Sequence, residues 1–309
     1  MANEGPRVDQ YSAADIHETV RRVLRDLGNP EPPLDLKAVR ELQKLDLTYY
    51  SKADLNLLDE MAHQVRLGKH NILSTAKRMK EVVSKAGLKA LIVPDQRHIY
   101  IDEEVVDKKK RFIEAHEITH DLLDWHRDIL LGDNDETLSV HCHEEMEAEA
   151  NYGARQLIFM GERFTVEVRD SLPDWRKLQA LAKLYGNSLT TTLWQTVYSC
   201  DPAAPMFGAI GQHPYYPNIG GRDGNQGIAY FIRSDAFFEN FPEVSERDIF
   251  GAMFSYVSRS KRGPLGDGIS TFRDANGELC EFHMQSFSNT YDVLTMGRFV
   301  KRHQKVIGF

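Results

Sequence analysis

Two histidines and a glutamate stand at the spacing of a helical metal site in residues 111–126, which read RFIEAHEITHDLLDWH. His116 and His120 are four residues apart, so both imidazoles project from one face of a helix, with Glu117 beside them. Two neutral imidazoles and one further protein ligand hold zinc in a site that leaves the fourth position for water. Zinc lowers the pKa of that water to about 7, and a neighbouring carboxylate can take its proton and return it to a leaving amine. The pattern therefore predicts metal-assisted hydrolysis of an amide.

The same segment also has the apolar positions of an ordinary amphipathic helix, which is the alternative explanation for so short a match. Phe112, Ile113, Leu122 and Leu123 form that apolar face. Polar groups placed on such a face cost free energy unless they have partners. Because two histidines and a glutamate would be costly there without a use, we favour the metal interpretation.

Two residues compete for the role of third ligand. His126 follows His116 by ten residues, the spacing of HExxHxxGxxH proteins, but Leu123 stands where that pattern needs the glycine of a sharp turn. Glu147 lies on a second expected helix, and Asn151, four residues later, shares its face. Glu147 could complete the zinc shell while Asn151 accepts the second ring N–H of a ligating histidine. The spacing favours Glu147 over His126, which could instead end a helix, where a cation suits the helix dipole.

The motifs of this region resemble a known family. AHEITHDLL, followed by EAEAN and an aliphatic helix, is similar to the ImmA/IrrE family of zinc metallopeptidases across about residues 90–160. The resemblance implies that His116, His120 and Glu147 bind Zn²⁺ and that Glu117 is the catalytic base. Known members cleave a helix-turn-helix transcriptional repressor and so release mobile-element or DNA-damage-response genes. The chain is therefore expected to be a zinc endopeptidase with a transcriptional repressor as its protein substrate.

Two short segments depart from the commonest form of the family. Ile118-Thr119 stands where many members have Leu-Gly, and Phe159-Met160-Gly161 where many have Leu-Met-Pro. Neither departure touches an expected ligand. They bear on the details of the substrate more than on metal binding.

A polar stretch separates the two expected helices. Residues 127–143 read RDILLGDNDETLSVHCH and contain a turn signal, which predicts a loop that could hang over the site as a flap. Zincins generally need an extra donor for the tetrahedral oxyanion, and His141, His143 and Tyr152 are the candidates. Cys142 could also bind metal together with its histidine neighbours, but ligands so close in sequence are awkwardly placed to close on one ion.

The charge of the chain is unevenly distributed. Of the 309 residues 27% are charged and 41% hydrophobic, as in ordinary globular proteins, and the formal net charge is -8. Residues 205–309 carry 11 basic and 11 acidic side chains, so the acidic excess of 35 against 27 lies in residues 1–204. An acidic catalytic half is a poor nonspecific partner for nucleic acid and a plausible one for a basic protein.

The cysteines and the hydropathy pattern predict the compartment. Cys142, Cys200 and Cys280 form no CxxC pair, which indicates reduced thiols rather than a disulfide framework. The first ten residues are polar, and no apolar run approaches the roughly 18 residues that a membrane span requires. We therefore expect a cytoplasmic protein without a membrane partner.

The segments before the motif predict a scaffold of helices and extended strands. An apolar-periodic run from Ser12 to Gly28 predicts a helix that Ser12 caps. The runs KALIVPD and RHIYIDEE predict a hairpin. We expect residues 98–102 to form a sheet edge that binds the substrate as an added strand, with an interior strand as the alternative.

Composition shifts divide the chain into three expected domains. Residues 1–165 predict a zincin-like metallopeptidase domain of α+β class, and residues 166–204 a helical segment with the LAxxYGxS spacing of a helix-turn-helix. Residues 205–309 predict an α+β domain, with a hairpin across Asn276-Gly277, that could hold a small molecule or a protein partner. A helix-turn-helix-like middle followed by a GAF-like domain also occurs in some ImmA/IrrE members. Residues 188–200 contain no Lys or Arg, so direct DNA binding is not expected.

Two other functions compete with the peptidase. The first is a zinc-stabilised regulator that acts by docking to a partner without catalysis. The second is a DNA-binding regulator that uses the helix-turn-helix-like segment. The acidic balance and the uncharged second helix count against the second.

Overall fold

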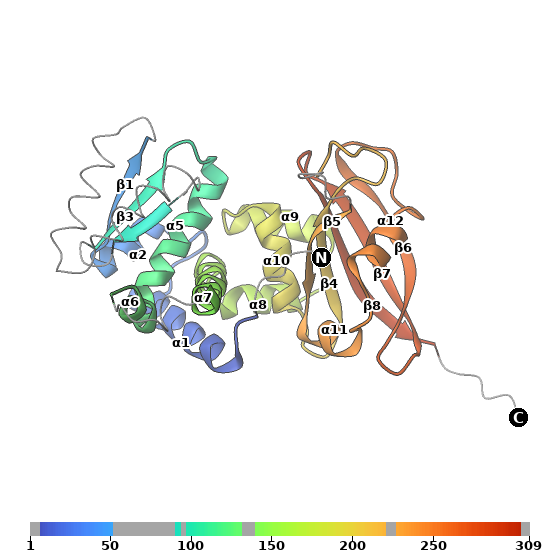
Figure 1. The fold of residues 1–309 in the computed structure, drawn as a ribbon, viewed down its shortest axis with the longest axis horizontal. Coiled ribbons are helices and arrows are strands. Elements are labelled where there is room, and N and C mark those ends of the chain that lie inside the picture. The colour runs from blue at the N-terminus through green and yellow to red at the C-terminus, as the bar shows by residue number, and fades with distance from the viewer. Residues whose placement is uncertain (1–6, 52–89, 94–96, 132–139, 221–226, 304–309) are drawn as a thin grey trace, which may run out of the picture. The chain divides into compact units, whose positions relative to one another are not determined.

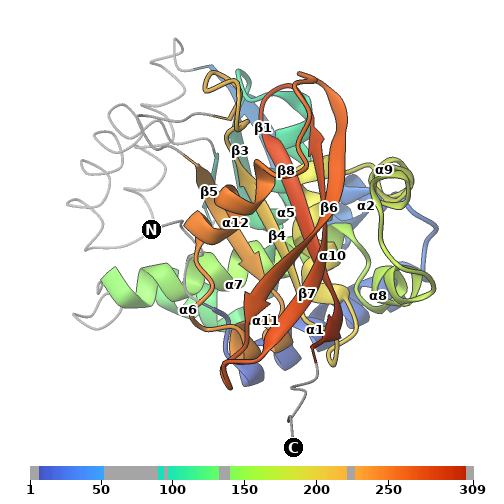
Figure 2. The same cartoon turned by 90° about the vertical axis from the view of Figure 1, so that its right-hand side faces the viewer.

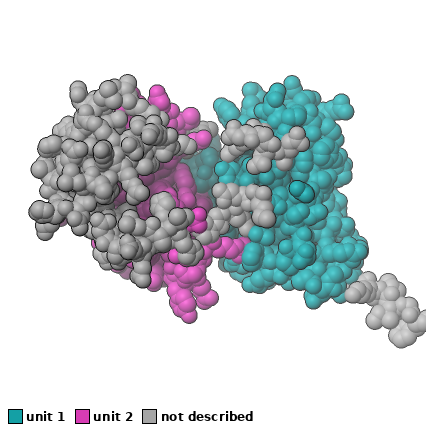
Figure 3. Space-filling model, in the orientation of Figure 1, with its two compact units in different colours: residues 1–4, 162–309 teal, residues 5–161 magenta. Residues whose placement is uncertain are grey.

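The computed structural model describes residues 7–51, 90–93, 97–131, 140–220 and 227–303, and these form a mixed α+β fold (Figure 1). The chain divides into two compact units (Figure 3). The N-terminal unit spans residues 5–161 and the C-terminal unit residues 162–309. Among the described residues, no helix combines the length and the hydrophobicity that crossing a bilayer requires. The segment 166–204, expected as a domain of its own, belongs to the C-terminal unit.

The N-terminal unit combines a small sheet with helices that carry the HExxH motif. Its sheet has the order β1-β3-β2, with β3 parallel to β1 and antiparallel to β2. The strands are β1 (Asp46–Tyr50), β2 (Ala90–Val93) and β3 (His98–Asp102). The helices are α1 (Gln10–Asp26), α2 (Leu36–Gln43), α5 (Asp107–Leu122), α6 (Asp124–Leu131) and α7 (Val140–Ile158).

The expectation that residues 98–102 form an edge strand is wrong. β3 lies between β1 and β2, so both of its edges are already paired. The physical reason is its composition, because Ile99, Tyr100 and Ile101 are all buried and a strand buried on both faces needs neighbours on both sides. Within the described part of the sheet, β2 has one paired edge only.

Helix α1 begins earlier than the sequence indicates. Asp9, not Ser12, is its N-cap, and the Asp9 carboxylate accepts hydrogen bonds from the backbone N–H groups of Tyr11 and Ser12. Ile16, Val20 and Val23 are buried, and α1 packs against α7. Ser12 is thereby left inside the first turn, where its side chain interacts with Glu149 of α7.

The HExxH segment is not one continuous helix to residue 126. Helix α5 ends at Leu122, and Leu123 is extended with φ −93° and ψ 104° before α6 begins at Asp124. Leu123 is buried, and the acidic side chain of Asp124 suits the first turn of the new helix. The chain therefore turns after the motif although no glycine is present, and His126 lies on α6.

Helix α7 begins at Val140, so residues 141–143 form its first turn instead of the expected loop. Short polar runs are ambiguous because an exposed helical turn and a loop have similar compositions. Residues 132–139, the remainder of the expected flap, lie outside the described residues. The side chains of His141, Cys142 and His143 are likewise outside the description.

The C-terminal unit is built on a five-stranded antiparallel sheet of order β5-β4-β8-β7-β6. Its strands are β4 (Met206–Gly211), β5 (Ile228–Arg233), β6 (Gly263–Arg273), β7 (Leu279–Ser288) and β8 (Val293–Arg302). Its helices are α8 (Glu162–Arg169), α9 (Trp175–Leu184), α10 (Leu189–Ser199), α11 (Asp235–Asn240) and α12 (Glu246–Met253). The expected hairpin across Asn276-Gly277 is present between β6 and β7. Figure 2 faces the side of the sheet that carries α11 and α12.

The helix-turn-helix-like segment forms α9 and α10, with Ser188 as the N-cap of α10 as the sequence predicts. Gly186, at φ 67°, makes the turn between them. Helix α10 packs against β4, β5 and β8 on the face of the sheet opposite α12 (Figure 1). Its buried residues are Thr192, Leu193, Gln195, Thr196, Val197 and Ser199. The second helix of the pair is therefore a core element of its unit.

A glycine allows α5 and α7 to approach each other closely. A Cβ at Gly153 of α7 would lie 2.4 Å from Thr119 Cγ2 of α5. Thr119 cannot easily rotate away, because its hydroxyl donates a hydrogen bond to the Ala115 carbonyl at 2.7 Å.

We predict that Gly153→Ala destabilises the N-terminal unit by about 1–3 kcal/mol, because the new methyl group overpacks the contact between the helices. Adding Thr119→Ser should restore most of the loss, since serine keeps the hydroxyl and lacks the clashing methyl. Thermal unfolding of the two variants and the wild type measures both effects. Equal destabilisation of Gly153→Ala in the two backgrounds would show that this contact does not set the helix spacing.

Candidate metal centre

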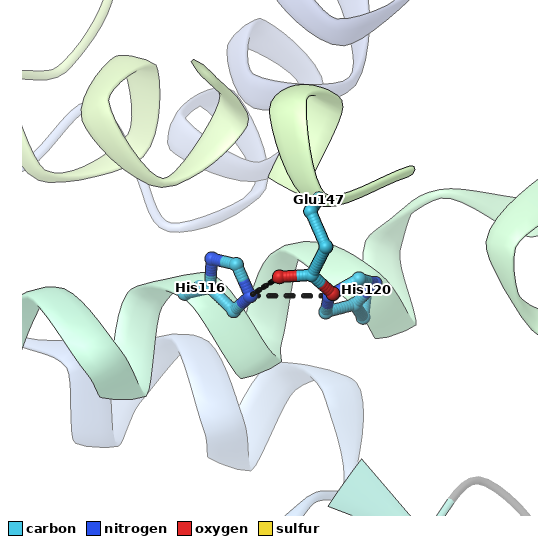
Figure 4. Close-up of side chains that lie close together, drawn as sticks. All are labelled: His116, His120 and Glu147. Atoms are coloured by element: carbon cyan, nitrogen blue, oxygen red, sulfur yellow. Dashed lines mark hydrogen bonds and ion pairs between the residues drawn. The ribbon is translucent and has the colours of Figure 1, made fainter. Parts of the chain in front are cut away.

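Three side chains from two helices converge at the N-terminal unit's HExxH motif (Figure 4). His116 and His120 of α5 place their Nε2 atoms 3.2 Å apart. Glu147 reaches them from α7, with one carboxylate oxygen 3.4 Å from His116 Nε2 and the other 3.5 Å from His120 Nε2. Among the described residues, these three form the group of potential metal ligands.

The separation of the two histidine nitrogens fits a zinc ion. Ligands placed tetrahedrally at about 2.0–2.1 Å from zinc lie about 3.3–3.4 Å from one another, and the two Nε2 atoms are 3.2 Å apart. The two oxygens of Glu147 each face one ring, and with one donor atom from each residue the three atoms lie within 4.8 Å of one another. The Glu147 side chain is 42% exposed while that of His120 is 7% exposed, so solvent can reach the site beside the carboxylate. The donor set therefore fits a three-ligand site with one open position.

Asn151 contacts the ring nitrogen of His116 that does not face Glu147. Its side-chain oxygen lies 3.2 Å from His116 Nδ1 and can accept the proton of that nitrogen. His116 Nε2 is then the nitrogen with the lone pair. This is the geometry expected for Asn151 from its position four residues after Glu147 on α7.

His126, the alternative third ligand, lies outside the donor cluster. It is fully buried on α6, and its Nδ1 lies 2.9 Å from Nδ1 of His120, on the side of that ring away from Glu147. Its Nε2 lies 2.8 Å from a carboxylate oxygen of Glu149. The break at Leu123 brings His126 back toward His120, but to the ring nitrogen that does not face the cluster.

Burial and mutual contacts set the protonation of the cluster. Burial opposes ionisation of Glu147, yet its hydrogen bonds to His116 and His120 hold the pKa of this carboxyl below its ordinary value. Burial lowers the pKa of His120 to about 4, so the ring is neutral near pH 7. For His116 burial also opposes the charge, but the bond to Glu147 and the nearby Glu117 leave its pKa raised. A cation between these groups would compete with a proton for His116 Nε2.

Glu117 has the environment of a base that works near neutral pH. The residue is buried, and desolvation together with the negative charge of Glu147 raises its pKa to about 7, against the opposing effect of His116. The backbone N–H of Ile92, on β2, donates a hydrogen bond that favours the ionised form. A carboxylate with a pKa near the working pH is suited both to accept a proton and to release it.

The three expected oxyanion donors are not brought into the cluster by any described contact. The Tyr152 hydroxyl lies 2.6 Å from His17 Nε2 of α1, and the two rings stack. His141 and His143 lie in the first turn of α7, and their side chains are not described. Their roles stay predictions.

Sequence reasoning missed Glu149 and Trp125. The Trp125 Nε1–H donates a hydrogen bond of 2.7 Å to the same Glu149 oxygen that faces His126. Glu149 lies two residues after Glu147 and so points to a different side of α7, where the helical spacing gives no reason to connect it with the metal. The signal that could have pointed to Glu149 is the presence of a second carboxylate on α7, a helix that is largely buried.

Comparisons with known proteins show a similarity of fold. No protein family model and no curated protein matches this chain. A solved structure described as a Mycobacterium tuberculosis transcriptional regulator is similar, with a TM-score of 0.50 and 12% sequence identity. The match covers 93% of this chain and 88% of that chain. At this identity the similarity concerns the fold alone.

The burial of Glu117 predicts a pH-dependent stability in the metal-free protein. Because folding raises its pKa from 4.5 to about 7, the folded state binds this proton more tightly than the unfolded state does. Stability is therefore lost as the pH rises from 4.5 to 7, and the penalty above pH 7 is about 3 kcal/mol. Glu117→Gln cannot ionise, so with chelator present its melting temperature should exceed that of the wild type at pH 8. At pH 4.5 the gap should largely close, and a gap that is the same at both pH values would contradict this environment for Glu117.

Removing the carboxylate ligand should remove most metal binding. We expect the Zn²⁺ affinity of Glu147→Gln to fall by more than the roughly 10–100-fold that loss of an outer-shell partner costs. Glu144→Gln is the matched control, because Glu144 is an exposed glutamate one turn earlier on α7. Competition with a chromophoric chelator measures both variants. Equal affinities for the two would exclude Glu147 as a ligand.

Proposed function

We propose that this chain is a zinc endopeptidase of the ImmA/IrrE type with a zincin-like N-terminal unit. The observation that carries the proposal is the convergence of His116, His120 and Glu147, whose donor atoms lie within 4.8 Å of one another, with buried Glu117 next to the histidines in the sequence. An amphipathic helix that matched HExxH by chance would have no reason to receive a carboxylate from a second helix. The spacing, the open position and the pKa of Glu117 support hydrolysis over a purely structural metal site.

The residues of the chain divide the chemistry between them. Bound zinc would polarise the amide carbonyl and lower the pKa of the attacking water. Glu117 takes the proton of that water, since its carboxylate has a pKa of about 7. It then gives the proton to the departing amine nitrogen, which must be protonated before the bond breaks cleanly. Asn151 keeps His116 oriented throughout.

The edge of β2 is the proposed place for the substrate backbone. β2 pairs with β3 on one side, and the backbone of Ile92 forms a hydrogen bond with Glu117. An extended peptide added along the outer edge of β2 would run beside the catalytic base. We therefore propose that β2, and not β3, forms the main-chain hydrogen bonds with the substrate.

We propose a transcriptional repressor as the substrate, and the wider role as transcriptional regulation. The resemblance of the motifs to repressor-cleaving peptidases supports it, as does the fold similarity to a protein described as a transcriptional regulator. The acidic excess of residues 1–204 suits a basic, DNA-binding protein as partner. The C-terminal unit, in the proposal, is a GAF-like sensor for a small molecule or a docking domain for a protein.

Direct DNA binding through α9 and α10 is disfavoured. A recognition helix must present side chains to base edges and usually needs basic residues for phosphates. Helix α10 has no Lys or Arg, and its buried side chains pack on the sheet of the C-terminal unit. The helix pair therefore supports a structural role within its unit.

The test is cleavage of candidate repressors encoded beside the gene, followed by mass spectrometry of the fragments. We expect the zinc-loaded wild type to cut one repressor at a defined bond, and Glu117→Gln to bind zinc but to cut at least about 1,000-fold more slowly, by loss of the general base. Glu144→Gln should cut like the wild type. If Glu117→Gln retains full function in derepression, the chain acts by docking and the peptidase proposal fails.

A further inference from the structure

A buried chain of side chains leads from His120 away from the metal centre. His120 Nδ1 lies 2.9 Å from His126 Nδ1, and His126 Nε2 lies 2.8 Å from Glu149 Oε2. His126 is fully buried, and the Glu149 side chain is 13% exposed. The contact between two imidazole nitrogens requires that one of them carries a proton and that the other does not.

The carboxylate at the far end decides which nitrogen carries that proton. Glu149 Oε2 accepts a hydrogen bond of 2.7 Å from the Trp125 Nε1–H, a group that can only donate, and the same oxygen lies 2.8 Å from His126 Nε2, so it faces His126 as an acceptor. His126 Nε2 must then be the N–H donor, and Nδ1 of a neutral His126 has the lone pair. The proton between the two rings consequently belongs to His120 Nδ1. His120 Nε2 is left with a lone pair directed at His116 and Glu147.

We propose that His126 and Glu149 are positioning residues that hold His120 in its metal-binding tautomer. This inference rests on the metal site of the proposed function and adds the part of the structure that prepares one ligand for the ion. Neither residue touches the metal position. They act through the second ring nitrogen of His120, and the hydrogen bond to His126 also increases the electron density that His120 can donate.

Glu149, the last side chain of this hydrogen-bonded series, lies on α7 and accepts hydrogen bonds from donors on α6 and α1. Glu149 Oε2 accepts hydrogen bonds from Trp125 Nε1 on α6 as well as from His126, and Ser12 on α1 contributes a further side-chain hydrogen bond. A carboxylate with this many donors cannot rotate without losing them. The orientation of His126, and through it that of His120, is therefore set by the packing of α1, α6 and α7 together.

The two histidine ligands are prepared differently. His116 is supported by the neutral amide of Asn151, and His120 by a histidine that a buried carboxylate orients. The extended residue Leu123 makes the second arrangement possible, because the turn it introduces brings His126 back over His120. His126 acts on the metal site through its hydrogen bond with His120, although its spacing from His116 is that of a direct ligand.

The tautomer of His120 in the metal-free wild type is the first test. Long-range proton–nitrogen correlation spectra of ¹⁵N-histidine-labelled protein distinguish a protonated Nδ1 from a protonated Nε2, and His120→Gln assigns the ring. We expect His120 to carry its proton on Nδ1 and His126 on Nε2. A proton on His120 Nε2 in the wild type would overturn the proposal, and the tautomer itself is read from the unaltered protein.

Zn²⁺ affinity of two His126 variants is the second test. His126→Leu fills the space without an acceptor, so we expect its Kd for Zn²⁺ to rise by about 10–100-fold. In His126→Gln the amide oxygen can accept from His120 and the amide nitrogen can donate to Glu149, so we expect most of the affinity to be retained. A residue that served only packing would give the opposite order, because leucine suits a buried site better than glutamine does.

His213→Leu is the matched control for removing a buried histidine. His213 is also fully buried, but it lies in the C-terminal unit and its Nε2 bonds to the Ser260 carbonyl. Its Kd for Zn²⁺ should equal that of the wild type. Equal affinities for His126→Leu and the wild type would overturn the proposal, as would a loss that is the same for His126→Leu and His126→Gln. These readouts use no substrate, so a failure to find cleavage would remove the proposed function and leave this inference standing.

Discussion

The structure of the N-terminal unit depends on holding two imidazole nitrogens 3.2 Å apart, with one oxygen of a carboxylate 3.4 Å from the first and the other oxygen 3.5 Å from the second. Two imidazole lone pairs and a carboxylate repel one another when nothing positive lies between them, and burial strengthens that repulsion because little water is present to screen it. A proton shared with His116 reduces the repulsion in the metal-free protein, and a divalent cation would remove it more completely. The arrangement destabilises the metal-free protein, and it supplies the donor atoms that bind a metal ion.

Several neighbouring residues allow these three side chains to converge. Gly153 and the fixed rotamer of Thr119 let α7 come close enough to α5 for Glu147 to span both rings. Asn151 and His126 then form hydrogen bonds with the Nδ1 atoms of His116 and His120, respectively. Burial also raises the pKa of Glu117, so this proposed base is held in an environment that destabilises its charge. Local conflicts of this kind are expected where a sequence serves chemistry as well as folding.

The sequence predicts those features that follow from spacing along one helix. His116 and His120, or Glu147 and Asn151, meet because residues four apart share a face, and no knowledge of the fold is needed to pair them. The contact of Thr119 with Gly153 and that of His126 with Glu149 join different helices, so they depend on how α5, α6 and α7 pack. The position of β3 between β1 and β2 likewise depends on the order of the strands in the sheet, which the spacing along one strand does not give. The Leu123 break was missed because the sequence offers no glycine or proline there.

The central claim is that two histidines and one carboxylate of this chain bind zinc and leave one position for water. X-ray absorption at the zinc edge of the loaded protein tests it most directly. We expect a four-coordinate ion with two imidazoles among nitrogen and oxygen ligands at about 2.0–2.1 Å and no sulfur neighbour. A sulfur neighbour at about 2.3 Å, which would point to Cys142, or a third imidazole would contradict the ligand set.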